Sequence, residues 1–143
     1  MLYLHQTLAS ELADELVAVA ERQLMRSQVI AKPGEGEGAN VQKQAIDPVR
    51  TSHGMFITNW KEWTMVATMS LRLRVAKLLG LPEENIEATQ ILRYESGQYY
   101  KSHLDAFDDW DTFNMKRGGQ RIATVLTWLN DVPSGGETSF PLS

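Results

Sequence analysis

Two stretches of the chain repeat hydrophobic residues at the spacing of an α-helix. The first covers residues 10 to about 28, and its apolar stripe consists of Leu12, Leu16, Val19 and Leu24. Ser10 is placed to act as the N-cap, and Glu11 suits the positive end of the helix dipole. The pattern therefore predicts an amphipathic helix that buries one face.

The second helical pattern begins at Asn59 or Lys61 and continues to Leu79. Its apolar and small residues recur at helical steps, and they include Trp63, Val66, Met69, Ser70, Leu73, Val75 and Leu78. Gly80 followed by Pro82 is a strong signal for the end of a helix.

Beyond Pro82 the pattern changes to one typical of strands. Residues Ile86 to Tyr94 alternate, and residues Ile122 to Leu129 are β-branched or apolar almost throughout, as expected for a strand buried on both faces. Asp131 to Gly136 is predicted to be a turn. We see no internal repeat, so the sequence predicts a single domain, residues 1–143, with helices packed on a β core.

The segment between the two expected helices has a different character. Residues 32–40 contain Gly34, Gly36 and Gly38 in alternation and offer no apolar face to bury. We expect residues 31–49 to form a mobile surface loop. From these residues alone, a flexible insertion and a lid over a site are equally good interpretations.

Composition narrows the functional classes. With 143 residues, the chain is too short for two domains that each have a full hydrophobic core. Its net charge is −4, and it lacks the clustered Lys and Arg of a nucleic-acid-binding protein. It has no cysteine, which excludes disulfides and thiolate ligands, so a metal here would need His, Asp or Glu. We see no membrane-spanning segment and no signal peptide, and both a secretory-lumen and a cytoplasmic location remain open.

The sharpest chemical feature is His103-Leu104-Asp105. In an extended segment, residues two apart point to the same side, so one imidazole nitrogen and one carboxylate oxygen can bind the same metal ion. They would supply two of the three ligands of the facial arrangement of two His and one carboxylate that is typical of non-haem iron(II). Taken alone, the tripeptide fits a surface His beside a solvated Asp better.

The residues around this tripeptide favour the metal. The segment from Gln90 to Asp105 resembles the entry to the metal site of the prolyl 4-hydroxylases, which belong to the iron(II)- and 2-oxoglutarate-dependent dioxygenases. The matching positions are Tyr94, Gly97, Gln98, Tyr100, His103 and Asp105. Three more segments resemble family motifs in the same order: Arg50-Thr-Ser-His-Gly54, Gly118 to Asn130, and Gly135-Gly-Glu-Thr-Ser-Phe-Pro141.

The resemblance implies a role for each matching residue. His103 and Asp105 would bind iron(II), and Tyr94 and Thr138 would hydrogen-bond 2-oxoglutarate. Positions that contact the peptide substrate in the family correspond to Arg50, Ser52, Glu87, Tyr100 and Arg121. Competing interpretations are an ordinary core position for Tyr94, a surface charge at a strand end for Arg121, and a solvated loop residue for Arg50.

The resemblance also implies a fold and a reaction. The fold would be a double-stranded β-helix, or jelly roll, with the N-terminal helices packed on one sheet. The reaction would hydroxylate C4 of a peptidyl proline with iron(II), oxygen and 2-oxoglutarate, giving succinate and CO2, with L-ascorbate as a further cofactor. The loop at 31–49 would close over a proline-rich peptide, becoming ordered when the peptide binds.

One part of the family pattern has no counterpart here. The family carries a second iron-binding His and a Lys for the 2-oxoglutarate carboxylate beyond the motif at 135–141, and neither His5 nor His53 lies at the required place. We therefore expect an incomplete domain whose C-terminal strands are missing. The alternatives are a piece of a longer protein, a chain completed by a second one, and a shortened relative without catalysis.

Two rival functions remain. The metal motif does not choose the substrate, so another 2-oxoglutarate oxygenase is the alternative enzyme. A jelly-roll module that binds a ligand without catalysis is the alternative from a different class.

Overall fold

The computed structural model describes residues 8–30, 44–59, 61, 65–109 and 111–141. Most of the expected loop at 31–49 therefore lies outside the described residues, as does the start of the second expected helix after Lys61.

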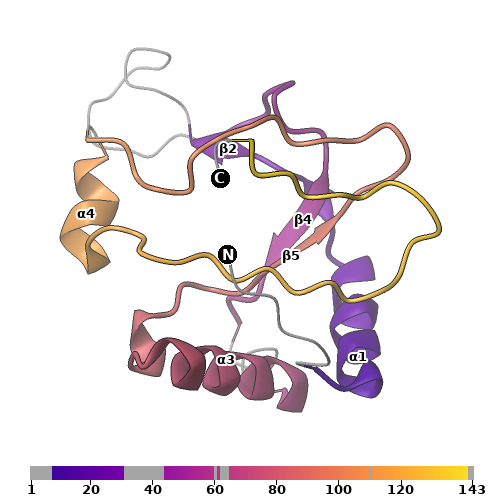
Figure 1. Ribbon diagram of the computed structural model, residues 1–143, viewed down its shortest axis with the longest axis horizontal. Helices are drawn as coiled ribbons and strands as arrows, with labels where there is room; N and C mark the ends of the chain where they lie inside the picture. Colours follow the sequence, from indigo (N-terminus) through magenta and orange to yellow (C-terminus); the bar gives the residue numbers. More distant parts are fainter. Residues whose placement is uncertain (1–7, 31–43, 60, 62–64, 110, 142–143) are drawn as a thin grey trace.

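The described residues form an α+β structure (Figure 1). Its helices are α1 (Ser10–Glu21), α3 (Val66–Leu79) and α4 (Thr112–Gly118), with a 3-10 turn, η1 (Glu83–Asn85). Its strands are β1 (Met25–Arg26), β2 (Val29–Ile30), β3 (Gln44–Ala45), β4 (His53–Phe56) and β5 (Gln90–Arg93). This confirms the coarse prediction of helices packed against β structure.

Strand β4 lies at the centre of a three-stranded antiparallel sheet in the order β1-β4-β5. Its register against β5 pairs His53 with Arg93 and Phe56 with Gln90, and β1 pairs on the other edge. A separate two-stranded sheet joins β2 to β3. The sheet therefore places the chain around residue 53 directly beside the chain around residue 93.

Helix α1 is shorter than the sequence pattern predicts. It begins at Ser10, but the N-cap is Ala9, and it ends at Glu21 instead of near residue 28. The reason is that Met25 and Arg26 leave the helix and pair with β4. The inter-strand hydrogen bonds of the sheet replace those that a longer helix would have made.

Helix α3 ends where the sequence predicted, because Gly80 caps it in the left-handed conformation with φ 66°. The helix buries Arg72 completely, and this guanidinium holds the chain that follows η1. It forms an ion pair with Glu83 and donates to the carbonyl oxygens of Glu87, at 2.7 Å, and of Ile86, at 2.9 Å. A buried charge is tolerated here because its donors find acceptors.

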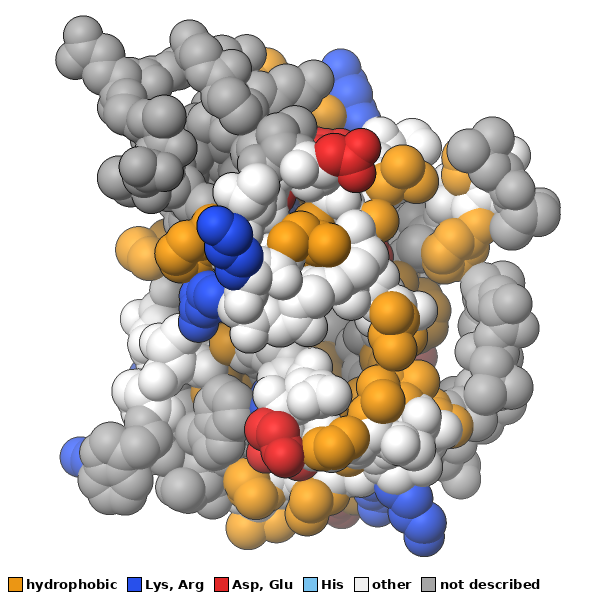
Figure 2. Space-filling view, turned by 90° about the vertical axis from the view of Figure 1, so that its left-hand side faces the viewer, with side chains coloured by type: hydrophobic (Ala, Val, Ile, Leu, Met, Phe, Trp, Pro, Cys, Tyr) orange, Lys and Arg blue, Asp and Glu red, His pale blue; other side chains and the backbone are white. Residues whose placement is uncertain are grey.

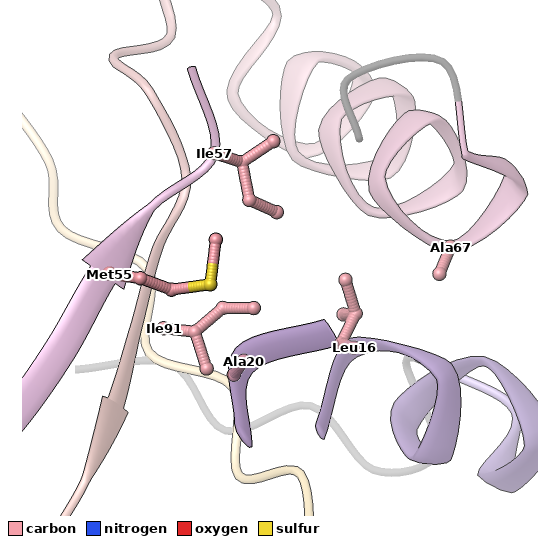
Figure 3. Close-up of a cluster of buried hydrophobic side chains, with 6 residues drawn as sticks. All are labelled: Leu16, Ala20, Met55, Ile57, Ala67 and Ile91. Carbon is pink, nitrogen blue, oxygen red and sulfur yellow. The ribbon is translucent and has the colours of Figure 1, made fainter. Parts of the chain in front are cut away.

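The core lies between the strands β4 and β5 and the two helices α1 and α3 (Figure 3). Its buried side chains are Leu16, Ala20, Met55, Ile57, Ala67 and Ile91. Figure 3 shows the side chains of the strands and of both helices converging on the same space. Both helices thus cover one face of the sheet.

The predicted strand at Ile122–Leu129 is wrong for the described structure. These residues form no strand, and the side chain of Ile122 is 79% exposed. Among the described residues no strand pairs with this segment, so its hydrophobic side chains are not enclosed from both faces. Only Leu129 packs against the edge of the core.

Other boundaries differ by smaller amounts. The strand expected at Ile86–Tyr94 is confined to Gln90–Arg93, because the chain bends at Ile86 directly after η1 and the buried Arg72 binds the carbonyl oxygens of Ile86 and Glu87. The turn expected at 131–136 is confirmed by bends at Pro133 and Ser134 and by positive φ at the two glycines that follow.

Hydrophobic side chains also reach the surface around α4. Figure 2, which views the molecule from the side of α4 in Figure 1, shows them beside scattered charged groups. In α4 itself, Phe113 is half exposed. No helix in the described part of the chain is long and apolar enough to cross a membrane.

The central position of β4 leaves little room for a side chain at Gly54. A Cβ at this residue would lie 2.7 Å from Leu92 Cδ2 and 3.1 Å from the carbonyl oxygen of Ile91. We expect Gly54→Ala to lower the free energy of unfolding by about 1–3 kcal/mol through overpacking. Urea unfolding measures this loss.

Gly118→Ala is the matched control, since a Cβ there meets nothing within 4 Å. It should change the free energy of unfolding by less than about 0.5 kcal/mol. Equal stability of Gly54→Ala and wild type would contradict the expected overpacking against Leu92 and the Ile91 carbonyl.

Candidate metal centre

The backbone around the site is set by pairing between residues 49–51 and 99–101. The Thr51 amide donates to the Tyr99 carbonyl at 2.8 Å, and the Lys101 amide donates to the Val49 carbonyl at 2.9 Å. Arg50 and Tyr100 thereby form an antiparallel bridge. This pairing places the Arg50 segment next to the residues that lead into His103.

His103 and Asp105 lie in irregular chain just beyond this pairing. Their side chains point to the same side, with His103 Nε2 3.4 Å from Asp105 Oδ1, while Leu104 between them is 81% exposed. This is the alternation expected of residues two apart in extended chain. The His103 side chain is 38% exposed and that of Asp105 is 45% exposed, so both can be reached from solvent.

The imidazole of His103 is held from two directions. Its Nδ1 lies 2.7 Å from the Lys101 carbonyl oxygen, and because a carbonyl only accepts, Nδ1 carries the hydrogen. Its ring stacks on Tyr100 with centroids 3.7 Å apart and 18° between the planes. In the neutral ring, the lone pair is therefore on Nε2, the nitrogen next to Asp105.

The carboxylate of Asp105 is also fixed. Its Oδ2 accepts a hydrogen bond from the Thr124 hydroxyl at 2.5 Å, which leaves Oδ1 as the oxygen beside His103. Its backbone carbonyl accepts from Arg121 Nη1 at 3.1 Å. Both contacts come from the segment that follows α4.

Arg121 is paired with Glu87 through two parallel hydrogen bonds. Nε donates to Oε1 at 2.6 Å and Nη2 donates to Oε2 at 2.8 Å, the fork-shaped geometry favoured by guanidinium and carboxylate. The hydrogen bond from Glu87 raises the pKa of Arg121 above its already high ordinary value. The guanidinium also lies over the ring of Phe107, 4.3 Å from its centroid.

Arg50 and Ser52 are both buried. Arg50 is 7% exposed, which excludes the interpretation of a solvated loop residue. Arg50 Nε donates to Ser52 Oγ at 3.3 Å, and Ser52 Oγ donates to Ser27 Oγ at 3.0 Å. The Arg50 guanidinium lies 4.7 Å from the centroid of the Tyr100 ring. The Tyr100 ring therefore contacts a cation as well as the ring of His103.

The structure does not bring all predicted residues together. Tyr94 follows β5 and is 43% exposed, and Thr138 lies in the exposed C-terminal segment. No contact described for either residue reaches His103 or Asp105. A hollow beside α4, lined by residues from Phe107 to Gln120, also does not include the pair.

The residues present fit a metal ion in two respects. Two ligands that bind one ion at right angles, each about 2.1 Å from it, lie roughly 3 Å apart, close to the distance between His103 Nε2 and Asp105 Oδ1, which is 3.4 Å. A metal-binding His commonly donates its other nitrogen to a carbonyl, as His103 does to Lys101. Among the described residues no group of three His, Asp or Glu side chains gathers, so they supply two ligands.

Sequence reasoning missed two supporting residues. Thr124 contacts Asp105 across 19 positions, and Gln120 holds the Phe107 backbone through hydrogen bonds of 2.7 and 2.9 Å. Both fall inside the motif at 118–130, which was the one available signal. Neither residue could be identified from the motif alone, because the sequence does not show that this segment lies beside residues 105–107.

The surroundings of Tyr100 raise the pKa of its phenol. Burial raises the pKa of its phenol above the ordinary 10.0 and the nearby Asp105 adds to the rise, although Arg50 opposes it. The neutral phenol is thus favoured in the folded state, and its contribution to stability is complete below pH 10.0 and is lost as the pH rises through the folded-state pKa.

An absorbance titration of tyrosinate in wild type and in Tyr100→Phe isolates this group by difference. The difference should show a midpoint above 10.0, and Tyr99→Phe, which changes the neighbouring tyrosine, should retain that phase. A midpoint for Tyr100 at or below 10.0 would contradict the burial seen here.

The segment that carries the candidate site is similar to known proteins. Residues 89–142, which include the pair and Thr124, match the 2OG-Fe(II) oxygenase superfamily. Prolyl 4-hydroxylase 1 of Arabidopsis thaliana is 42% identical over 144 aligned residues, which cover 100% of this chain and 47% of that protein. Probable prolyl 4-hydroxylase 6 of the same plant is 43% identical, over 94% of this chain and 43% of its own length.

A third relative extends the same picture. Prolyl 4-hydroxylase 2 of Arabidopsis thaliana is 41% identical over 90% of this chain and 39% of its own length. The chain thus spans less than half the length of these curated relatives. Residues 89–142 thus resemble the 2OG-Fe(II) oxygenase superfamily, and nearly the whole chain is similar to part of the prolyl 4-hydroxylases of Arabidopsis thaliana.

Proposed function

We propose that this chain forms part of a prolyl 4-hydroxylase, which hydroxylates C4 of a peptidyl proline with oxygen and 2-oxoglutarate and releases succinate and CO2. The observation that carries the proposal is the approach of His103 Nε2 to Asp105 Oδ1 at 3.4 Å, within the segment that matches the oxygenase superfamily. The relatives named prolyl 4-hydroxylase support the choice of substrate.

His103 and Asp105 would hold iron(II) through Nε2 and Oδ1. Bound iron(II), together with 2-oxoglutarate and oxygen, supplies the oxidising power that protein side chains lack. The protein's own contribution is orientation: the Lys101 carbonyl fixes the tautomer of His103, and the Tyr100 ring fixes its plane. The side chains of His103 and Asp105 are therefore oriented by protein contacts without a bound metal.

The remaining ligands would come from outside the described residues. A third metal ligand and a cation for the 2-oxoglutarate carboxylate would lie on the same polypeptide or on a second chain. Tyr94 and Thr138 would donate hydrogen bonds from their hydroxyls to 2-oxoglutarate. L-ascorbate would serve as a further cofactor. The two hydroxyls are of the right chemistry, since each can donate to a carboxylate.

The peptide would bind beside Tyr100. This half-buried ring offers an apolar surface against the Arg50 guanidinium, behind which lies the fully buried Ser52. The exposed pair of Glu87 and Arg121 would supply further hydrogen-bonding groups to the peptide. A proline-rich peptide suits such a surface because its stiff polyproline II form loses little entropy on binding. Residues 31–49 would close over the peptide and become ordered. Protease cleavage of this loop, compared with and without peptide, would measure that closure.

The complete fold would be the jelly roll implied by the sequence. The sheet β1-β4-β5, covered on one face by α1 and α3, would form one side of it. Further strands would pair with the hydrophobic segment 122–129, whose exposed side chains need a cover.

A test of the function supplies iron(II), 2-oxoglutarate, ascorbate and a polyproline peptide to the full-length protein. We expect succinate and a peptide mass gain of one oxygen. His103→Ala and Asp105→Ala should each lower turnover by at least about 10²-fold, because each removes one of the two ligands. Asp109→Ala, which changes an exposed carboxylate four residues further on, is the control and should retain activity.

Each other outcome has a definite meaning. Succinate without oxidised peptide would favour an oxygenase with a different substrate. Neither product would favour a binding module, and full activity of either ligand variant would remove the assignment of the site.

A further inference from the structure

Thr124 makes the one side-chain hydrogen bond described for the Asp105 carboxylate. Its hydroxyl lies 2.5 Å from Oδ2, and an ionised carboxylate only accepts, so Thr124 donates. The other oxygen, Oδ1, faces His103 Nε2 at 3.4 Å. The two oxygens of Asp105 thus have different partners on different sides.

The segment that carries Thr124 is held independently on both sides. Three residues earlier, Arg121 donates twice to Glu87 and once to the Asp105 carbonyl. Five residues later, Leu129 packs against the core. The segment therefore has contacts other than the Thr124 hydroxyl on either side of Thr124, and we expect its backbone to keep its place when that hydroxyl is removed.

The geometry points to Thr124 as a positioning residue for the metal, a role that rests on the proposed function. By occupying Oδ2, the hydroxyl turns the carboxylate so that Asp105 presents Oδ1 alone beside His103. A carboxylate free to rotate would spread between binding through one oxygen and through both, and would lose orientation when it binds. The partner of a metal ligand commonly makes such a contribution.

The role predicts a loss of metal affinity in variants without the hydroxyl. Mn(II) is a suitable probe, because it prefers the same oxygen and imidazole ligands and its free form is measured directly by electron paramagnetic resonance. In the full-length protein, we expect Thr124→Val and Thr124→Ala to weaken Mn(II) binding roughly ten- to a hundred-fold. Thr124→Ser keeps a hydroxyl and should stay within a few-fold of wild type.

Thr127→Val in the same segment is the matched control and should bind Mn(II) as wild type does. Thermal unfolding of every variant separates a loss of Mn(II) affinity from a loss of the fold. Recovery of Mn(II) affinity in Thr124→Ser shows that the hydroxyl itself is needed. Wild-type affinity in both Thr124→Val and Thr124→Ala would overturn the inference.

A further variant separates this inference from the proposed function. If His103→Ala abolishes Mn(II) binding while Thr124→Val leaves it intact, the metal site stands and the role of Thr124 falls. If wild type binds no Mn(II), or His103→Ala binds it equally well, both fall together.

Discussion

The antiparallel pairing of residues 49–51 with residues 99–101 is the constraint on which the site depends. It is made by backbone hydrogen bonds that continue the approach of β4 to β5, so it is fixed by the core beneath the sheet. Its consequence is that the Tyr100 ring contacts the Arg50 guanidinium and stacks on the ring of His103. A shift of this pairing by one residue would turn Tyr100 to the other face and remove both contacts.

A second set of contacts connects helix α3 to the candidate ligands. Arg72, buried in α3, holds the backbone carbonyl of Glu87, and the Glu87 carboxylate holds Arg121. Arg121 then holds the Asp105 backbone, while Thr124 from the same segment holds its carboxylate. Each step joins charged or polar groups with defined directions, which is how a site on irregular chain acquires a fixed shape.

The sequence predicted what depends on local spacing. The end of α3 at Gly80 and the common side of His103 and Asp105 both follow from the periodicity of one short segment. The strand at 122–129 was wrong because hydrophobicity indicates a need for burial but does not supply a pairing partner. The contacts of Arg72 and Thr124 join segments distant in sequence, so no local pattern contains them.

The central claim is that His103 and Asp105 bind one metal ion between Nε2 and Oδ1. Anomalous scattering at the iron edge, from crystals of the full-length protein grown with iron(II) and 2-oxoglutarate without oxygen, tests it most directly. The account predicts a single anomalous peak within bonding distance of both atoms, about 2.0–2.3 Å. A peak elsewhere, or none beside these two residues in iron-loaded crystals, would contradict it.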